Sequence, residues 1–75
     1  MDVQRLVTMA NDIARYFASE PDREAAIEAV ADHLRKFWTP RMREQIADHL
    51  GAADTGFDDL TRQAVERLDA GRIAD

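Results

Sequence analysis

The chain has no cysteine, only two prolines and three glycines, and no long apolar run among its 75 residues. Without cysteine it can form neither a disulfide framework nor a site with thiolate ligands, and this excludes bound zinc or iron–sulfur centres of the thiolate type. No apolar run approaches the ~20 residues of a membrane span, and the first residues lack the pattern of a signal peptide. We therefore expect a cytoplasmic protein with no membrane contact.

Positive charge is scarce, since ten basic residues face fifteen acidic ones and the net charge is −5. This balance argues against nucleic acid as a partner, because neutralising phosphates needs a surplus of lysine and arginine. Residues 35–43 nevertheless hold four of the basic residues and no acid. Removing their +4 from the net −5 leaves −9 on the rest of the chain. The sequence predicts a dipolar molecule with one basic corner.

Apolar residues recur at the three- and four-residue spacing of a helix, and no strand pattern is present. A first helix is predicted from about residue 2 to Ala18, with Asp2 as its N-terminal cap. Pro21 prevents Glu20 from continuing that helix and suits the first turn of a second one. The buried face of the first helix is predicted to contain Val3, Leu6, Val7, Ala10, Ile13, Ala14 and Phe17.

The second helix is predicted to stop at Thr39 and Pro40, because the residue before a proline is excluded from the helical region. Thr39 can then cap a third helix that opens with Pro40, and Gly51 is predicted to end it in the left-handed conformation. The buried face of the second helix contains Ala26, Ile27, Val30, Ala31 and Leu34, completed by Phe37 or Trp38. That of the third contains Met42, Ile46 and either His49 or Leu50.

A fourth helix is predicted from near Asp58 to Gly71, after a loop over residues 52–56. Its inward side chains are Phe57, Leu60, Ala64, Val65 and Leu68. These elements predict an all-α fold, a small compact bundle of about four short helices in a single domain over residues 1–75. Thirteen alanines thin out its core, so we expect the isolated chain to depend on a partner or to associate with itself.

The residues that a catalyst would need are few. The pairs Asp32-His33 and Asp48-His49 are adjacent in sequence, and adjacent side chains diverge by about 100° on a helix. There is no cysteine nucleophile and no glycine-rich phosphate loop. We expect no enzymatic activity, no bound metal and no cofactor, with each histidine packed at the edge of the core and donating one hydrogen bond.

The basic corner is the candidate site. A tryptophan flanked by arginines at a junction between helices is typical of a protein interface, where aromatic and arginine side chains contribute most of the binding energy. The alternative is a solvated turn in which Arg35 pairs with Asp32 and Arg43 with Asp48. The predicted partner-binding residues are Arg35, Lys36, Phe37, Trp38, Pro40, Arg41 and Arg43.

The run His-Leu-Arg-Lys-Phe-Trp-Thr-Pro-Arg-Met-Arg at residues 33–43 resembles the signature of a known family, the delta subunit of soluble, NAD-dependent, molybdenum-containing formate dehydrogenases. Met9-Ala10-Asn11, followed by Ile13-Ala14 and Phe17, is similar to the amino-terminal segment of that family. Ala64-Val65 and Leu68 suit its last helix. The central run is specific, because helix periodicity does not require a Phe-Trp-x-Pro-Arg-Met-Arg string.

Such subunits accompany larger chains that hold a molybdenum cofactor, iron–sulfur clusters and FMN. The resemblance therefore implies a non-catalytic accessory subunit that supports assembly, cofactor insertion or stability of the enzyme, with the catalytic subunit or a maturation protein as its partner. Two alternatives stay open. One is a stand-alone helical homodimer that acts as an adaptor. The other, less favoured because of the surrounding negative charge, is a small DNA-binding module.

Overall fold

Four α-helices and one short 3₁₀ turn account for the secondary structure of residues 2–74, with no strand among them. The computed structural model describes the backbone of these residues and the side chains of residues 2–71. The helices are α1 (Val3–Phe17), α2 (Arg23–Phe37), α3 (Pro40–Asp48) and α4 (Asp59–Ala74), and the 3₁₀ turn η1 (His49–Gly51) follows α3. The all-α prediction is confirmed.

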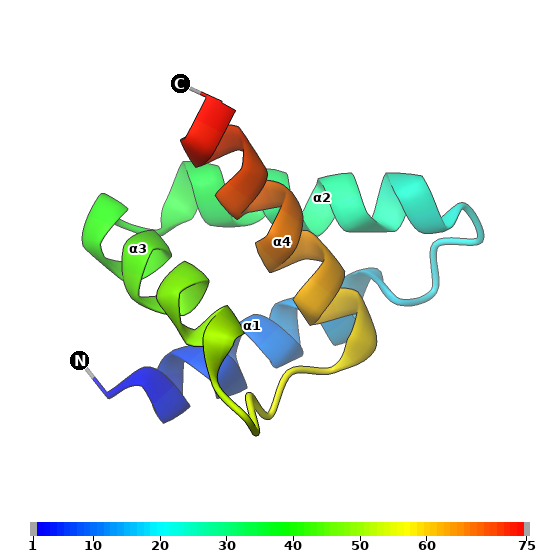
Figure 1. Cartoon of the computed structure of the whole chain (residues 1–75). Coiled ribbons are helices and arrows are strands. Elements are labelled where there is room, and N and C mark those ends of the chain that lie inside the picture. The colour runs from blue at the N-terminus through cyan, green and yellow to red at the C-terminus, as the bar shows by residue number, and fades with distance from the viewer. Residues whose placement is uncertain (1, 75) are drawn as a thin grey trace.

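The helices cross one another rather than lying in parallel. In Figure 1, α4 passes across α2, α1 lies beneath, and α3 flanks the other three. The most extensive contact between two helices is that of α2 with α4. A radius of gyration of 11.2 Å matches the roughly 11 Å expected for a compact chain of this length. No helix within residues 2–74 is long and apolar enough to cross a membrane.

The predicted caps at the starts of α1 and α3 are confirmed. The side chain of Asp2 accepts a hydrogen bond from the backbone N–H of Gln4, and that of Thr39 accepts one from the N–H of Met42, at 3.2 Å. Each bond satisfies an amide that has no partner within the helix. Pro40 occupies the first helical turn, where its missing N–H costs nothing.

Three predicted helix boundaries are wrong. Pro21 lies before α2 rather than in its first turn, because Asp22 caps that helix and accepts from the N–H of Glu24. Gly51 does not take the left-handed conformation. The end of α3 tightens instead into η1, so no left-handed residue is needed there. Helix α4 runs past Gly71 to Ala74, since a helical glycine costs only about 1 kcal/mol and no proline follows.

Two adjoining clusters of buried side chains form the core. The first draws on all four helices, and the second lies where α1, α2 and α4 meet. The choice that the sequence left open at the end of α2 is settled, because Trp38 joins the first cluster and Phe37 does not. The first cluster contains Leu6, Val7, Ala10, Leu34, Trp38, Ile46, Val65 and Leu68, and the second Ala14, Ala26, Ile27, Val30, Leu60 and Ala64.

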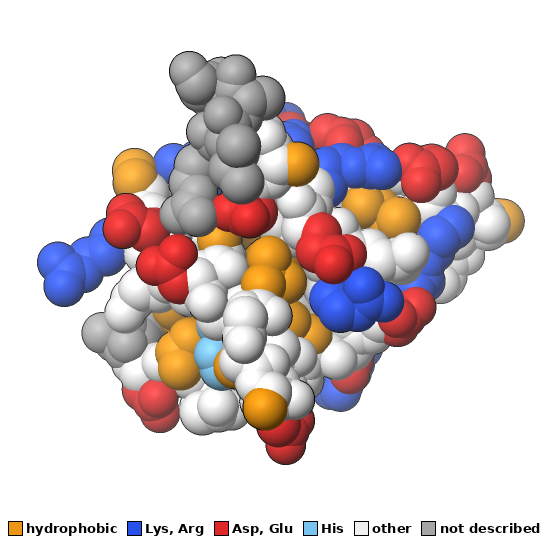
Figure 2. Space-filling model, in the orientation of Figure 1, with side chains coloured by type: hydrophobic (Ala, Val, Ile, Leu, Met, Phe, Trp, Pro, Cys, Tyr) orange, Lys and Arg blue, Asp and Glu red, His pale blue; other side chains and the backbone are white. Residues whose placement is uncertain are grey.

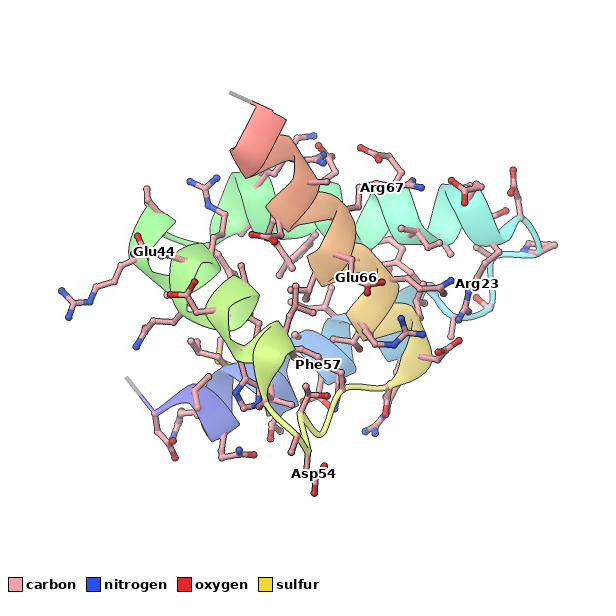
Figure 3. All side chains as sticks on the ribbon, viewed as in Figure 1. Arg23, Glu44, Asp54, Phe57, Glu66 and Arg67 are labelled. Atoms are coloured by element: carbon pink, nitrogen blue, oxygen red, sulfur yellow. The ribbon has the colours of Figure 1, made fainter. Side chains whose placement is uncertain are left out.

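Asn11 fixes the connection that leads into α4. Its side-chain amide donates to the carbonyl oxygen of Gly56, and its carbonyl oxygen accepts from the backbone N–H of Asp58, both at 3.0 Å. Gly56 adopts a φ of +78°, a conformation that glycine takes without strain. In this connection Phe57 points toward the core and Asp54 away from it (Figure 3). Asn11 is itself buried, so one α1 side chain positions the start of α4.

Candidate functional site

The junction between α2 and α3 carries the predicted partner-binding residues. Helix α2 closes with a hydrogen bond from the N–H of Trp38 to the carbonyl oxygen of Leu34, at 3.0 Å. Trp38 and Thr39 are both extended, and for Thr39 this follows from the exclusion of the residue before a proline from the helical region. Pro40 then starts α3 in a new direction. The break therefore turns the chain within two residues.

The two aromatic residues at this junction face opposite ways. Trp38 is 6% exposed and packs in the core, whereas Phe37 is 71% exposed. Because a tryptophan offers the larger apolar surface, its burial fixes the junction to the rest of the molecule. Phe37 is left as the aromatic group of the junction that a partner could cover.

The predicted basic residues fall into two groups. Arg35 forms an ion pair with Glu28 and Lys36 forms one with Asp32, each at 2.9 Å. These two residues behave as the solvated-turn alternative expects, although Arg35 reaches Glu28 rather than Asp32. Their charges are largely matched by acids of α2 itself.

Arg41 and Arg43 form the other group, since neither makes an ion pair among the residues that the structure describes. Arg41 is exposed. Arg43 is half-buried, and its Nε atom is buried without a hydrogen-bond partner in the described part of the chain. The expected pair between Arg43 and Asp48 is absent. A buried donor left unpaired costs roughly 1 to 3 kcal/mol.

A shallow groove of about 360 Å³ lies beside Arg43. Among the described residues that line it, the basic residues Arg35 and Arg43 are matched in number by the acids Glu44 and Asp69. Figure 3 labels Glu44, one of the groove's lining residues, on α3. The lining residues are Arg35, Pro40, Arg43, Glu44, Ala47, Leu68, Asp69 and Gly71.

Where α2 and α4 cross, by contrast, arginines and carboxylates pair with each other. Arg67 contacts both Glu24 and Glu28, and Arg23 reaches Asp59 at 3.2 Å. Figure 2 shows acidic and basic side chains interleaved along this face, and Figure 3 places Arg23 and Arg67 at the crossing. Sequence reasoning missed these pairs, because their members lie 36 to 43 residues apart.

Pairing with arginines, chiefly with those of the same helix, lowers the pKa of two carboxyl groups at this crossing. The pKa of Glu28 is lowered chiefly because Arg35 donates a hydrogen bond to its carboxylate, with Arg67 adding to the effect. The pKa of Asp59 is lowered mainly by the hydrogen bond from Arg62. Both carboxylates are held in the charged form by neighbours within the chain.

The histidines are packed rather than clustered. Nε2 of His49 donates to the carbonyl oxygen of Thr55 at 2.9 Å, and its ring meets Phe57 edge-on, which confirms the expected packing with one hydrogen bond. His33 packs its ring between those of Phe17 and Phe37, but it makes no hydrogen bond among the described residues, so the hydrogen bond predicted for it is wrong. Among the described residues, no group of three or more His, Cys, Asp or Glu is arranged to hold a metal ion.

Tyr16 is an exposed aromatic residue that sequence reasoning missed. It is 79% exposed, and its ring contacts that of Phe17 at a centroid distance of 5.1 Å. A signal was present, because Tyr16 lies outside the apolar spacing that predicts the buried face of α1. An aromatic residue off the buried face of a helix is a candidate for a contact with another molecule.

Comparison with known protein families shows to which family this chain belongs. The sequence model of the family described as "NADH-dependant formate dehydrogenase delta subunit FdsD" matches residues 5–65. The chain belongs to this family. The match includes the α2–α3 junction, Asn11 and Tyr16. Nothing among curated proteins and nothing among solved structures matches the chain.

Proposed function

We propose that the chain is a non-catalytic accessory subunit of a cytoplasmic, molybdenum-containing, NAD-dependent formate dehydrogenase. It supports assembly, cofactor insertion or stability of the enzyme by binding the catalytic subunit or a maturation protein. Membership of the delta subunit family supports the enzyme as partner. No metal and no cofactor are assigned to this chain in the proposal, and neither nucleic acid nor membrane is a partner.

The observation that carries the proposed binding site is the unmatched positive charge at the α2–α3 junction. Arg41 and Arg43 make no ion pair among the described residues, although the chain has an excess of acids. We call the surface formed by Lys36, Phe37, Arg41 and Arg43 the cationic corner. Of the other predicted residues, Arg35 and Pro40 border it, and Trp38 supports it from the core. A partner with exposed carboxylates would complete the pairing that the chain lacks.

Co-purification tests this proposal. A tagged chain expressed from its native context should bring formate dehydrogenase subunits or a maturation protein with it, identified by mass spectrometry. Deleting the chain should lower formate oxidation or the molybdenum content of the enzyme while the catalytic subunits are still made. An unchanged enzyme in the deletion strain would contradict the accessory role.

The proposed site is tested separately by reversing its charge. The double variant Arg41→Glu/Arg43→Glu should associate more slowly, with a weaker dependence of the association rate on salt, because charges at an interface rim mainly steer encounter. Arg5→Glu is a suitable control, since Arg5 is an exposed arginine on α1 that also makes no ion pair among the described residues. Equal effects of both variants would contradict the assignment of the corner. The chain can also associate with a second copy of itself under this proposal. Sedimentation of the isolated chain would detect such a dimer.

A further inference from the structure

The exposed large apolar side chains of the described residues lie in one row of touching aromatic rings. Tyr16 contacts Phe17, Phe17 contacts His33 at 6.4 Å, and His33 contacts Phe37 at 4.7 Å between ring centroids. We call this row the aromatic strip. Its ends, Tyr16 and Phe37, are the exposed large hydrophobic residues, while Phe17 and His33 are half-buried between them. The strip joins the last turn of α1 to that of α2.

A single exposed apolar residue needs no explanation, but a continuous row of them does. The hydroxyl of Tyr16 makes no hydrogen bond within the described part of the chain, so the side chain is not fixed in place by a polar contact. Phe37 is adjacent to Trp38, which the same turn buries in the core. The fold therefore buries one of two neighbouring aromatic residues and leaves the other on the strip. Aromatic residues with low conformational freedom are typical anchors of protein interfaces.

The residues that follow the strip in the sequence, beyond Phe37, include an exposed arginine that makes no ion pair among the described residues. Phe37 belongs to both the strip and the cationic corner, and the unpaired Arg41 follows it by four residues across the break between α2 and α3. Lys36, on the other side of Phe37, is already paired with Asp32. A segment that covers the strip and continues past Phe37 toward the start of α3 would approach Arg41, whose positive charge favours a carboxylate in the partner.

We infer that the aromatic strip binds an apolar segment of a formate dehydrogenase subunit, and that a carboxylate following this segment pairs with Arg41. This inference rests on the proposed function and names the second half of the same binding surface. A second copy of the chain is the less favourable occupant, because it would bring together two molecules of net charge −5. Two exposed aromatic side chains also provide little of the ~800 Å² per partner that a stable dimer buries. A partner that covers the strip and the corner together has more surface to bury.

The test measures how tightly the purified chain binds formate dehydrogenase. The enzyme is isolated from a strain in which the gene for this chain is deleted. Tyr16→Ala and Phe37→Ala should each weaken binding by at least about thirtyfold, as expected for anchor residues, and the loss should be insensitive to salt. Tyr16→Phe and Phe37→Leu keep the apolar bulk and should stay within about threefold of the wild type. Because both side chains are exposed, all four variants should melt at the wild-type temperature.

Each other outcome decides against the inference. If the wild type binds and the Tyr16→Ala/Phe37→Ala double variant binds equally well, the strip is not the docking surface, although the accessory role survives. If the wild type itself does not bind the enzyme, this occupant is wrong, whereas the accessory role is decided by the deletion strain, because a maturation protein is the other partner proposed. If sedimentation shows a dimer of the isolated chain that the double variant abolishes, the strip binds a second copy instead.

Discussion

The crossing of α2 with α4 and the corner between α2 and α3 both carry arginines, yet only the first matches them with acids of the same chain. At the crossing, Arg23, Arg62 and Arg67 each contact at least one carboxylate. At the corner, Arg41 and Arg43 contact none among the described residues. The contrast teaches that arginine content alone does not identify a binding site. What distinguishes the two regions is whether the fold supplies the counter-charge.

Removing the support of the corner should have the largest effect. Trp38→Ala deletes a buried ring from the core cluster that draws on all four helices, and this should lower the free energy of unfolding by about 3 to 5 kcal/mol. Phe37→Ala, one residue away, removes an exposed ring and should change it by no more than about 0.5 kcal/mol. Urea denaturation followed by circular dichroism measures both. Equal losses would mean that the two rings do not face opposite ways.

Loosening the connection that leads into α4, at the α2–α4 crossing, should lower the free energy of unfolding by an intermediate amount. Asn11→Ala removes the two hydrogen bonds that hold the carbonyl of Gly56 and the N–H of Asp58, leaving both groups without these partners. A loss of about 1 to 3 kcal/mol in the free energy of unfolding is expected. Amide hydrogen exchange should rise first in the opening turn of α4, where the crossing with α2 begins. Exchange that rises instead around Thr39 would place the effect of Asn11 at the corner.

The crossing should also respond to acid, with a smaller change. The folded pKa of Glu28 lies below its ordinary value of 4.5 because Arg35 and Arg67 stabilise the carboxylate. A lowered folded pKa stabilises the protein above the unfolded pKa, and this contribution is lost as pH falls below 4.5 through the folded value. The loss should stay under about 1 kcal/mol, since the pairs are exposed and screened.

A matched pair of variants assigns this acid response to the ion pair of Glu28 with Arg35. Arg35→Gln should flatten the decline in unfolding free energy below pH 4.5, whereas Arg41→Gln should leave it as in the wild type, because Arg41 pairs with no carboxylate in the described chain. Thermal melts at a series of pH values give both profiles. A flattened profile for Arg41→Gln would show that the corner is paired in solution.

Local rules predicted the parts of this fold that depend on neighbouring residues. Asp2 and Thr39 cap helices because a short polar side chain at that position reaches a free amide of its own helix. The break at Pro40 follows from the geometry of proline. The same rules wrongly gave Gly51 a left-handed conformation and wrongly ended the last helix at Gly71, because a glycine permits a left-handed conformation without requiring one.

The site depended on contacts that local rules do not reach. The sequence located the cationic corner but could not choose between Phe37 and Trp38, since both fit the spacing of the buried face. The partner of Arg67 comes from another helix, so its pairing follows from the crossing of α2 with α4. Tyr16 stands beside Phe37 only through the rings of Phe17 and His33, which the tertiary fold brings together.

The most direct test of the contrast between the two regions compares Arg41→Glu with Arg67→Glu, two identical changes of charge. Unfolding free energy and affinity for the formate dehydrogenase subunits are measured for both. Arg67→Glu should lower the stability of the chain, because it places a third acid beside Glu24 and Glu28, and should leave binding of the folded chain unchanged. Arg41→Glu should leave stability within about 0.5 kcal/mol of the wild type and weaken binding. If both variants changed stability by the same amount and affinity by the same amount, the contrast between arginines paired at the crossing and arginines unpaired at the corner would be contradicted.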